Sequence, residues 1–352
     1  MIYCIYGFPH FHTSVVIKML IDLYSKVCMR LSTLHWEDIS PGFHRYPFAI
    51  YTSSTVCLEG TLMPWTPEFR GNTSIEYDGQ RIAIWDIEND PMDDPDLLTS
   101  NLVHEMFHCH QHASGHVDWP DDLMLLSLPA SPACDALRAE EHRLLREALL
   151  GDLPRAFGEF LRIRARRRSS DPALTREEEK VEALEGAAEF AGLRALTALK
   201  PDRYHESLSS VLAWLSADDE RFFDRRRMAY FTGTAIRLCL SAQGWPTDQL
   251  PDAQPPAGPI PPLSEKLCTA RQALDAAHRR RMSALLLDSR RVPCHAQLTG
   301  YDPMNMFRVD DQLICEHFAI LTDETGTIPL MSPVVLTLAP GSANLVVAYH
   351  IQ

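Results

Sequence analysis

The chain has 352 residues, of which 45% are hydrophobic and 23% are charged, and its formal net charge is −14 at pH 7. This composition is ordinary for a globular protein with one large domain or two moderate ones. The acidic excess argues against nucleic acid or a membrane surface as the main partner, because both bind clustered lysines and arginines. No stretch approaches the run of about 20 apolar residues that a membrane-spanning helix needs.

The cysteines and the start of the chain indicate a reducing compartment. The nine cysteines are scattered and contain no C-x-x-C pair, which argues against a disulfide framework and an all-thiolate zinc site. The first 20 residues lack a basic segment, and Pro9, His10 and His12 interrupt their apolar stretch, so we expect no signal peptide. We therefore expect a cytoplasmic protein.

The N-terminal quarter of the chain is expected to combine one helix with a small sheet. Residues 14–33 carry apolar side chains at helical spacing. Residues 45–63 and 72–89 are rich in β-branched and aromatic residues, and the sequence YDGQ predicts a tight turn between two strands. The acidic segment ENDPMDDPD predicts a loop whose aspartates stabilise the start of the next helix.

The rest of the chain is expected to be mainly helical and then β-rich. Helical periodicity is found near 97–112, 135–150, 153–168, 176–199, 204–216 and 220–242. A proline-dense connector at 246–262 precedes a further helix, and residues 292–352 have the pattern of a small antiparallel β unit. We expect an α+β fold with a domain at 1–245 (sheet at 46–92, helical part at 95–245), the connector, and a helix plus small β domain at 263–352.

Residues 104–108 read HEMFH, within the histidine-rich run SNLVHEMFHCHQHASGH. His104 and His108 lie four residues apart, so a helix presents both imidazoles on one face and turns its apolar side chains to the core. Glu105 lies about 100° round the helix, within reach of a water bound to the same ion. H-E-x-x-H is the arrangement of zinc peptidases, with two neutral imidazoles and a carboxylate as general base. The alternative is a polar helix face without a metal.

A catalytic zinc site needs a third protein ligand besides water. The metzincin continuation H-x-x-G-x-x-H is absent, because Gln111 and Ser114 occupy the positions of its glycine and last histidine. The remaining histidines of the run, His110, His112 and His116, are expected to be solvated or to face a substrate.

The sequence EGAAE offers a third ligand on a second helix. Glu185 and Glu189 lie one turn apart, and the mid-helix glycine between them, Gly186, costs roughly 1 kcal/mol relative to alanine. Close approach to the histidine helix would offset this cost. We then expect Glu185 to bind zinc and Glu189 to accept an N–H from a ligand histidine. The alternative is a solvated acidic face, to which we assign Glu178 and Glu182.

HEMFH followed at a distance by LEGAAEF resembles the gluzincin branch of the zinc peptidases, to which thermolysin belongs. The resemblance covers roughly residues 45–245 and implies a zincin-like catalytic core. It implies zinc ligands at His104, His108 and Glu185, a base at Glu105, and support for a histidine from Glu189. Two features depart from the family. His108 and Glu185 are separated by 76 residues, of which 139–170 are expected to form an inserted helical hairpin, and the supporting acid is Glu rather than Asp.

The expected function is a zinc-dependent peptidase that acts on a peptide or protein, with Glu105 moving the proton of a zinc-activated water. Tyr230 is the candidate for stabilising the oxyanion, with Tyr204 and His205 as alternatives. The strand at 81–86 is expected either to pair with an extended peptide or to be a core strand.

The sequence leaves a second function open and contains one further charged segment. The alternative function is a non-catalytic peptidase-like binding or scaffold protein, with or without zinc, and the presence of Glu105 favours the enzyme. The arginine run at 162–168 is expected to be a solvated face neutralised by REEEK rather than a nucleic-acid site.

Overall fold

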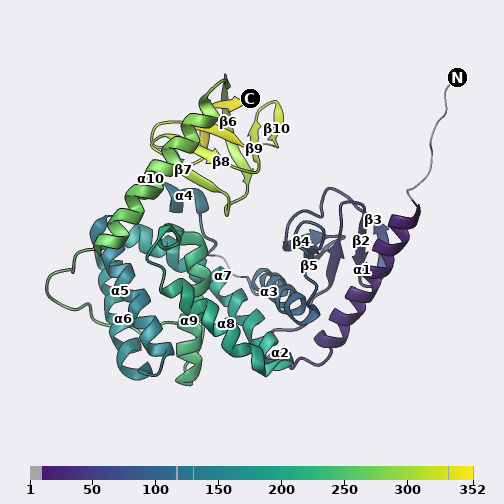
Figure 1. Cartoon of the computed structure of the whole chain (residues 1–352), viewed down its shortest axis with the longest axis horizontal. Coiled ribbons are helices and arrows are strands. Elements are labelled where there is room, and N and C mark those ends of the chain that lie inside the picture. The colour runs from purple at the N-terminus through teal and green to yellow at the C-terminus, as the bar shows by residue number, and fades with distance from the viewer. Residues whose placement is uncertain (1–9, 116–117, 130, 332, 352) are drawn as a thin grey trace. The chain divides into compact units, whose positions relative to one another are not determined.

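The computed structural model describes residues 10–115, 118–129, 131–331 and 333–351 (Figure 1). Residues 1–9 of the segment that bears on a signal peptide lie outside the described residues, as does His116. The fold is α+β, as expected, with one mixed and one antiparallel sheet. None of the helices in the described ranges is both long and apolar enough to cross a lipid bilayer.

The contacts within the chain define two compact units, Met1–Asp118 with Leu184–Ser210, and Trp119–Ala183 with Val211–Gln352. The division expected from the sequence follows chain order, whereas the contacts group the helices of 119–183 with the C-terminal sheet. The long helix α7 (Pro172–Leu199) contributes to both units, with its residues up to Ala183 in the second and those from Leu184 in the first. The proline-dense connector is free of helix and strand along its described length.

The first unit is built on a five-stranded sheet. Its elements are α1 (His10–Leu31), α2 (Trp36–Ile39), β1 (Phe48–Tyr51), β2 (Thr55–Leu58), β3 (Thr61–Pro64), β4 (Thr73–Tyr77), β5 (Gln80–Asp86), α3 (Pro95–Ala113), the second half of α7, η1 (Pro201–Arg203) and the start of α8 (Tyr204–Leu215). The strand order is β3-β2-β1-β5-β4, and only β1 and β5 run parallel.

The predicted turn at YDGQ is confirmed, since it joins β4 to β5. Asp78 and Gly79 both have positive φ, 49° and 76°, which is the conformation that a two-residue hairpin turn favours. β5 pairs with β4 on one side and β1 on the other, so the expectation that 81–86 binds a peptide by edge pairing is wrong. Strand order depends on contacts distant in sequence, which the local pattern does not contain. The sheet edge on this side is β4.

Alternate side chains of the strands build two hydrophobic layers. Phe48, Ile50 and Ala83 pack with the buried faces of α1 and α3. The other face of the sheet, including Tyr51 and Ile84, is closed by residues that follow β3. α3 packs against both β4 and β5, so the core fixes the helix that carries HEMFH.

The helical part of the second unit contains α4 (Asp122–Ser127), α5 (Pro132–Leu149), α6 (Leu153–Ser170), the first half of α7, the end of α8, η2 (Glu220–Phe223), α9 (Arg225–Ala242) and α10 (Glu265–Leu286). α5 and α6 pack against one another as a helical hairpin, as expected for the insertion between the two motifs. Phe157, Phe160 and Leu145 are buried at this contact.

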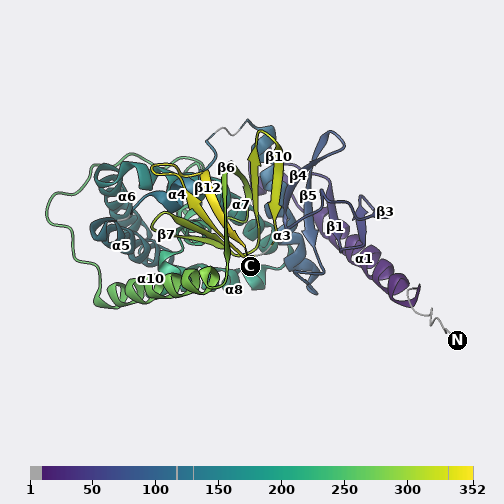
Figure 2. The same ribbon diagram turned by 90° about the horizontal axis from the view of Figure 1, so that it is seen from above.

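The β part of the second unit is a seven-stranded antiparallel sheet in the order β10-β9-β6-β12-β11-β8-β7. Its strands are β6 (Arg290–Tyr301), β7 (Met306–Val309), β8 (Gln312–Cys315), β9 (Ala319–Asp323), β10 (Gly326–Leu330), β11 (Val334–Leu338) and β12 (Leu345–Ile351). α10 lies beside β7 (Figure 2). It also contacts β11, and its Leu285 packs with Val309 and Val335. The expected C-terminal antiparallel β unit is therefore present.

The arginine run of α6 is a solvated face only in part. Its expected neutralisation by REEEK is confirmed, since Arg167 pairs with Glu178 and Arg168 lies 2.7 Å from Glu179. Arg162 and Arg168 are exposed, but two arginines of the run are buried. Arg164 and Arg167 are each 1% exposed. Arg164 lies 3.0 Å from Glu141 and 2.7 Å from Glu182, and Arg167 pairs with Glu141 and Glu178. These ion pairs form a buried network inside the helical part of the second unit.

The expectation of a solvated acidic face is likewise wrong for Glu178 and Glu182, which are both buried. Burial alone would raise the pKa of Glu178, but Arg167, Arg138 and Arg225 together lower it to about 2. A single sequence shows that a helix is charged but not which charges meet a partner.

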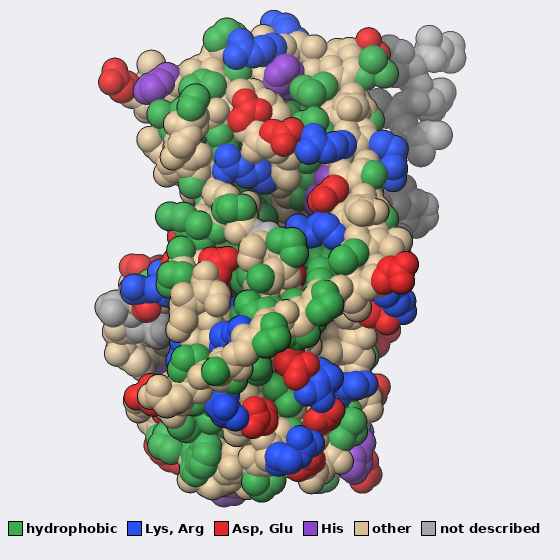
Figure 3. All heavy atoms as spheres, turned by 90° about the vertical axis from the view of Figure 1, so that its left-hand side faces the viewer, with side chains coloured by type: hydrophobic (Ala, Val, Ile, Leu, Met, Phe, Trp, Pro, Cys, Tyr) green, Lys and Arg blue, Asp and Glu red, His purple; other side chains and the backbone are tan. Residues whose placement is uncertain are grey.

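At the surface that Figure 3 shows, basic and acidic side chains are intermixed.

Candidate metal centre

The start of α3 is fixed by capping and ion pairs. Asp94 is the N-cap, and its side chain accepts from the backbone N–H of Asp96. Asp96 is buried and pairs with Arg30 of α1 and, at 3.2 Å, with Lys200 at the end of α7. The predicted role of the acidic loop at this helix start is thus confirmed, and the same aspartates connect α3 to its neighbours.

α7 approaches α3 closely at Gly192. A Cβ atom at this position would lie 2.9 Å from the backbone oxygen of Ser100 and 3.6 Å from the Cβ of His104. The Ser100 hydroxyl donates to the Gly192 carbonyl at 2.8 Å. Ala188 and Ala191, on the same face of α7, are in the shared core. The close approach expected through Gly186 stays a prediction, and the contact at Gly192 lies six residues further along α7.

We expect Gly192→Ala to lower the free energy of unfolding. Overpacking costs about 1–3 kcal/mol, and the higher helix propensity of alanine returns roughly 1 kcal/mol of it. The matched control is Gly158→Ala in α6, where an added Cβ meets nothing within 4 Å and should stabilise the protein. Urea unfolding of both variants measures the difference. A gain in stability for Gly192→Ala equal to that of the control would contradict the close approach.

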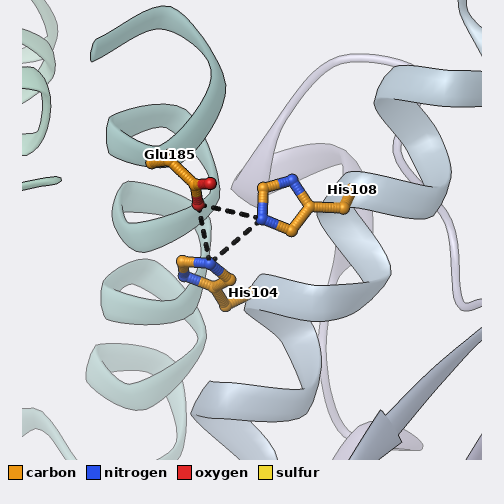
Figure 4. A group of neighbouring side chains, drawn as sticks. All are labelled: His104, His108 and Glu185. Atoms are coloured by element: carbon orange, nitrogen blue, oxygen red, sulfur yellow. Dashed lines mark hydrogen bonds and ion pairs between the residues drawn. The ribbon is translucent and has the colours of Figure 1, made fainter. Parts of the chain in front are cut away.

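The structure brings three predicted ligand atoms together (Figure 4). His104 and His108 project from α3, and Glu185 projects from α7. The His108 Nε2 atom lies 3.2 Å from the His104 Nε2 atom and 3.2 Å from Glu185 Oε2, and the third side of the triangle is 3.6 Å. Four ligands at about 2.0–2.1 Å round a tetrahedral zinc ion lie about 3.3–3.4 Å apart. The triangle therefore has the dimensions of one face of such a site.

In the described part of the chain, these residues make up the one group of three or more histidine, cysteine or carboxylate ligands close enough to share a metal ion. All three side chains are shielded: the histidines are 11% and 12% exposed and Glu185 is 7% exposed. A shielded site with two nitrogens and one oxygen suits zinc, whereas calcium and magnesium prefer oxygen alone.

Contacts outside the triangle orient both histidines. His104 donates from Nδ1 to the carboxylate of Glu189 at 3.2 Å, the contact that the sequence analysis proposed for this glutamate. His108 Nδ1 lies 2.8 Å from Oε1 of Gln111, a contact that was not expected from the sequence. Both Nε2 atoms are consequently left facing the triangle. The signal for Gln111 was its position three residues after His108, one helical turn away.

The electrostatics of the site favour a bound cation. Burial alone would lower the pKa of His104, but hydrogen bonds to Glu185 and Glu189, with the charge of Glu105, hold it well above its usual value. Burial raises the pKa of Glu105, to which Glu185 and Glu189 add, while His104 and His108 oppose the shift. Several carboxylates thus converge on two imidazoles, where a metal ion can replace a proton.

The other predicted residues lie as follows. Glu105 is buried on α3 between the two histidines of the motif. Tyr230 is half-buried on α9, which belongs to the second unit, whereas the three candidate ligands belong to the first. Its role in stabilising the oxyanion stays a prediction. Tyr204 and His205 begin α8 and contact one another, with ring centroids 5.8 Å apart.

Two spare histidines of the run differ in their surroundings. His110 is partly buried, and its ring contacts Phe43 and Phe107. His112 is exposed, as expected.

In comparisons with known proteins, no protein-family model, curated protein or solved structure matches the chain. The chemistry of the triangle is therefore inferred from its own residues.

Proposed function

We propose that this protein is a zinc-dependent peptidase with a zincin-like core, in which His104, His108 and Glu185 hold the metal. The observation that carries the proposal is the ligand triangle, with sides of 3.2, 3.2 and 3.6 Å, beside a buried glutamate on the same helix. Three protein ligands leave the fourth position of a tetrahedral zinc ion open, as in catalytic sites, whereas structural zinc sites have four protein ligands.

Zinc bound in the triangle would lower the pKa of a water molecule toward 7 and polarise the carbonyl group of a substrate. Glu105 would accept the proton of that water and then donate it to the leaving amine. Its raised pKa suits this role, because a general base works best when its pKa approaches the working pH. Glu189 and Gln111 would keep the imidazoles in the orientation that the site requires.

A peptide is the substrate that the neighbouring sheet favours. β4 forms the edge of the five-stranded sheet, and α3 packs against both β4 and β5. The unpaired backbone groups of an edge strand can hydrogen-bond an extended chain, which is a common mode of peptide recognition. We propose β4, rather than the strand at 81–86, as the edge that would hold the substrate.

A reducing compartment such as the cytoplasm forms part of the proposal. All eight cysteines in the described ranges are free thiols, and burial raises the pKa of several of them, for instance Cys239 to about 12. Buried thiols of this kind are inert and do not require an oxidising environment.

The test is metal analysis of the purified protein combined with cleavage of a peptide library. We expect one zinc ion per chain, and we expect cleavage that a chelator abolishes and added zinc restores. Stoichiometric zinc retained by both His104→Ala and Glu185→Ala would contradict the ligand assignment. Zinc bound through these residues without cleavage of any peptide would favour a non-catalytic binding protein.

A further inference from the structure

Gln111 joins the two helices that carry the ligand triangle. Its side chain is 6% exposed and lies on α3 one turn beyond His108. Oε1 is 2.8 Å from His108 Nδ1, and Nε2 donates to the backbone carbonyl of Leu184 on α7 at 2.9 Å. Leu184 is the residue before Glu185. A single buried amide therefore contacts one ligand directly and the backbone next to another.

The two contacts determine which ring nitrogen of His108 carries the proton. A backbone carbonyl only accepts hydrogen bonds, so the amide nitrogen of Gln111 must face Leu184. The amide oxygen then faces His108, and because this oxygen also only accepts, His108 Nδ1 must donate. A neutral imidazole has one N–H, so its Nε2 has a lone pair. That Nε2 is the atom at the corner of the triangle.

We propose that Gln111 is a positioning residue that holds His108 in the tautomer and ring orientation required for metal binding, and that ties this ligand to the α7 backbone beside Glu185. The inference rests on the proposed zinc site and adds a residue to it. The support for His104 is different in kind, because Glu189 is a carboxylate and is 44% exposed. Water can replace Glu189 more easily than it can replace a buried amide with both ends engaged.

The first test is Gln111→Leu, which keeps the size of the side chain and removes both hydrogen bonds. We expect zinc affinity, measured by competition with a chromophoric chelator, to fall about 10–100-fold at unchanged stoichiometry. Gln111→Glu keeps an acceptor for His108 Nδ1 but loses the donor to Leu184, so it should recover part of the affinity. The control is Gln243→Leu at the end of α9, where the amide donates to Cys239 O of its own helix. It should leave zinc affinity unchanged.

The second test does not depend on zinc. Nitrogen-15 NMR of the imidazoles in the metal-free protein should show His108 with its proton on Nδ1 in the wild type and a mixture of tautomers in Gln111→Leu. The inference would be overturned if both Gln111 variants bound zinc with wild-type affinity, or if the wild type carried its proton on His108 Nε2. Either result would leave the proposed zinc ligands unaffected. A wild-type protein that binds no zinc would overturn the proposed function and this inference together.

Discussion

Glu105→Gln is expected to abolish peptide cleavage while zinc stays bound. Glutamine has nearly the shape of glutamate, so it fits the buried position on α3, but its amide cannot accept and return a proton at neutral pH. General acid–base catalysis contributes typically 10²–10⁴-fold, and we expect kcat/KM to fall by about this factor or more. The proposed metal ligands are untouched, so we expect the zinc content to remain at one ion per chain.

The matched control for this substitution is Glu206→Gln on α8, because the Glu206 side chain is 74% exposed. We expect wild-type kcat/KM for the control, measured with the same peptide. If Glu105→Gln also cleaves at the wild-type rate, Glu105 is not the base. If it loses zinc together with activity, its role is to maintain the metal site rather than to move a proton.

Arg164→Met is expected to lower the free energy of unfolding by about 3–5 kcal/mol. The guanidinium group lies 3.0 Å from Glu141 and 2.7 Å from Glu182, and the arginine is 1% exposed. Methionine retains the aliphatic part of the side chain but leaves the carboxylates in the interior with less positive charge to offset them. Uncompensated buried charge is among the most destabilising changes that a single substitution can cause.

The comparison for Arg164 is Arg162→Met on the same helix. Arg162 is 47% exposed and lies 2.9 Å from Glu159, an exposed pair that is worth at most about 1 kcal/mol. Urea unfolding of the two variants should therefore give clearly separated midpoints. Equal and small losses would mean that water reaches Glu141 and Glu182 and that the network is not buried in solution.

Local patterns in the sequence were sufficient for most of the elements. The spacing of apolar residues predicted α3, α5, α6 and α7 to within a few residues of their ends, because an amphipathic helix carries its period in its own sequence. The i, i+4 spacing of His104 and His108 likewise placed both imidazoles on one face. Helix geometry alone determines both of these features.

Features that depend on distant partners were missed. The burial of Arg164 and Arg167 could not be read from an arginine run, because it depends on glutamates of two other helices. The internal position of β5 depends on strand order. Gln111 appeared only as a mismatch to one peptidase template, whereas its contacts arise where α7 passes α3. Each case requires the relative placement of elements, which no local pattern contains.

α7 carries two pairs of carboxylates, and the helical repeat sets the direction in which each pair projects. Along its 28 residues, Glu178 and Glu182 meet the buried arginines of the second unit, while Glu185 and Glu189 meet the histidines of the first. Successive side chains of an α-helix are rotated by about 100°. One residue inserted between Glu182 and Glu185 would therefore turn Glu185 and Glu189 away from the histidines. The register of a single helix thus decides which of its carboxylates face the buried arginines and which face the proposed metal ligands His104 and His108.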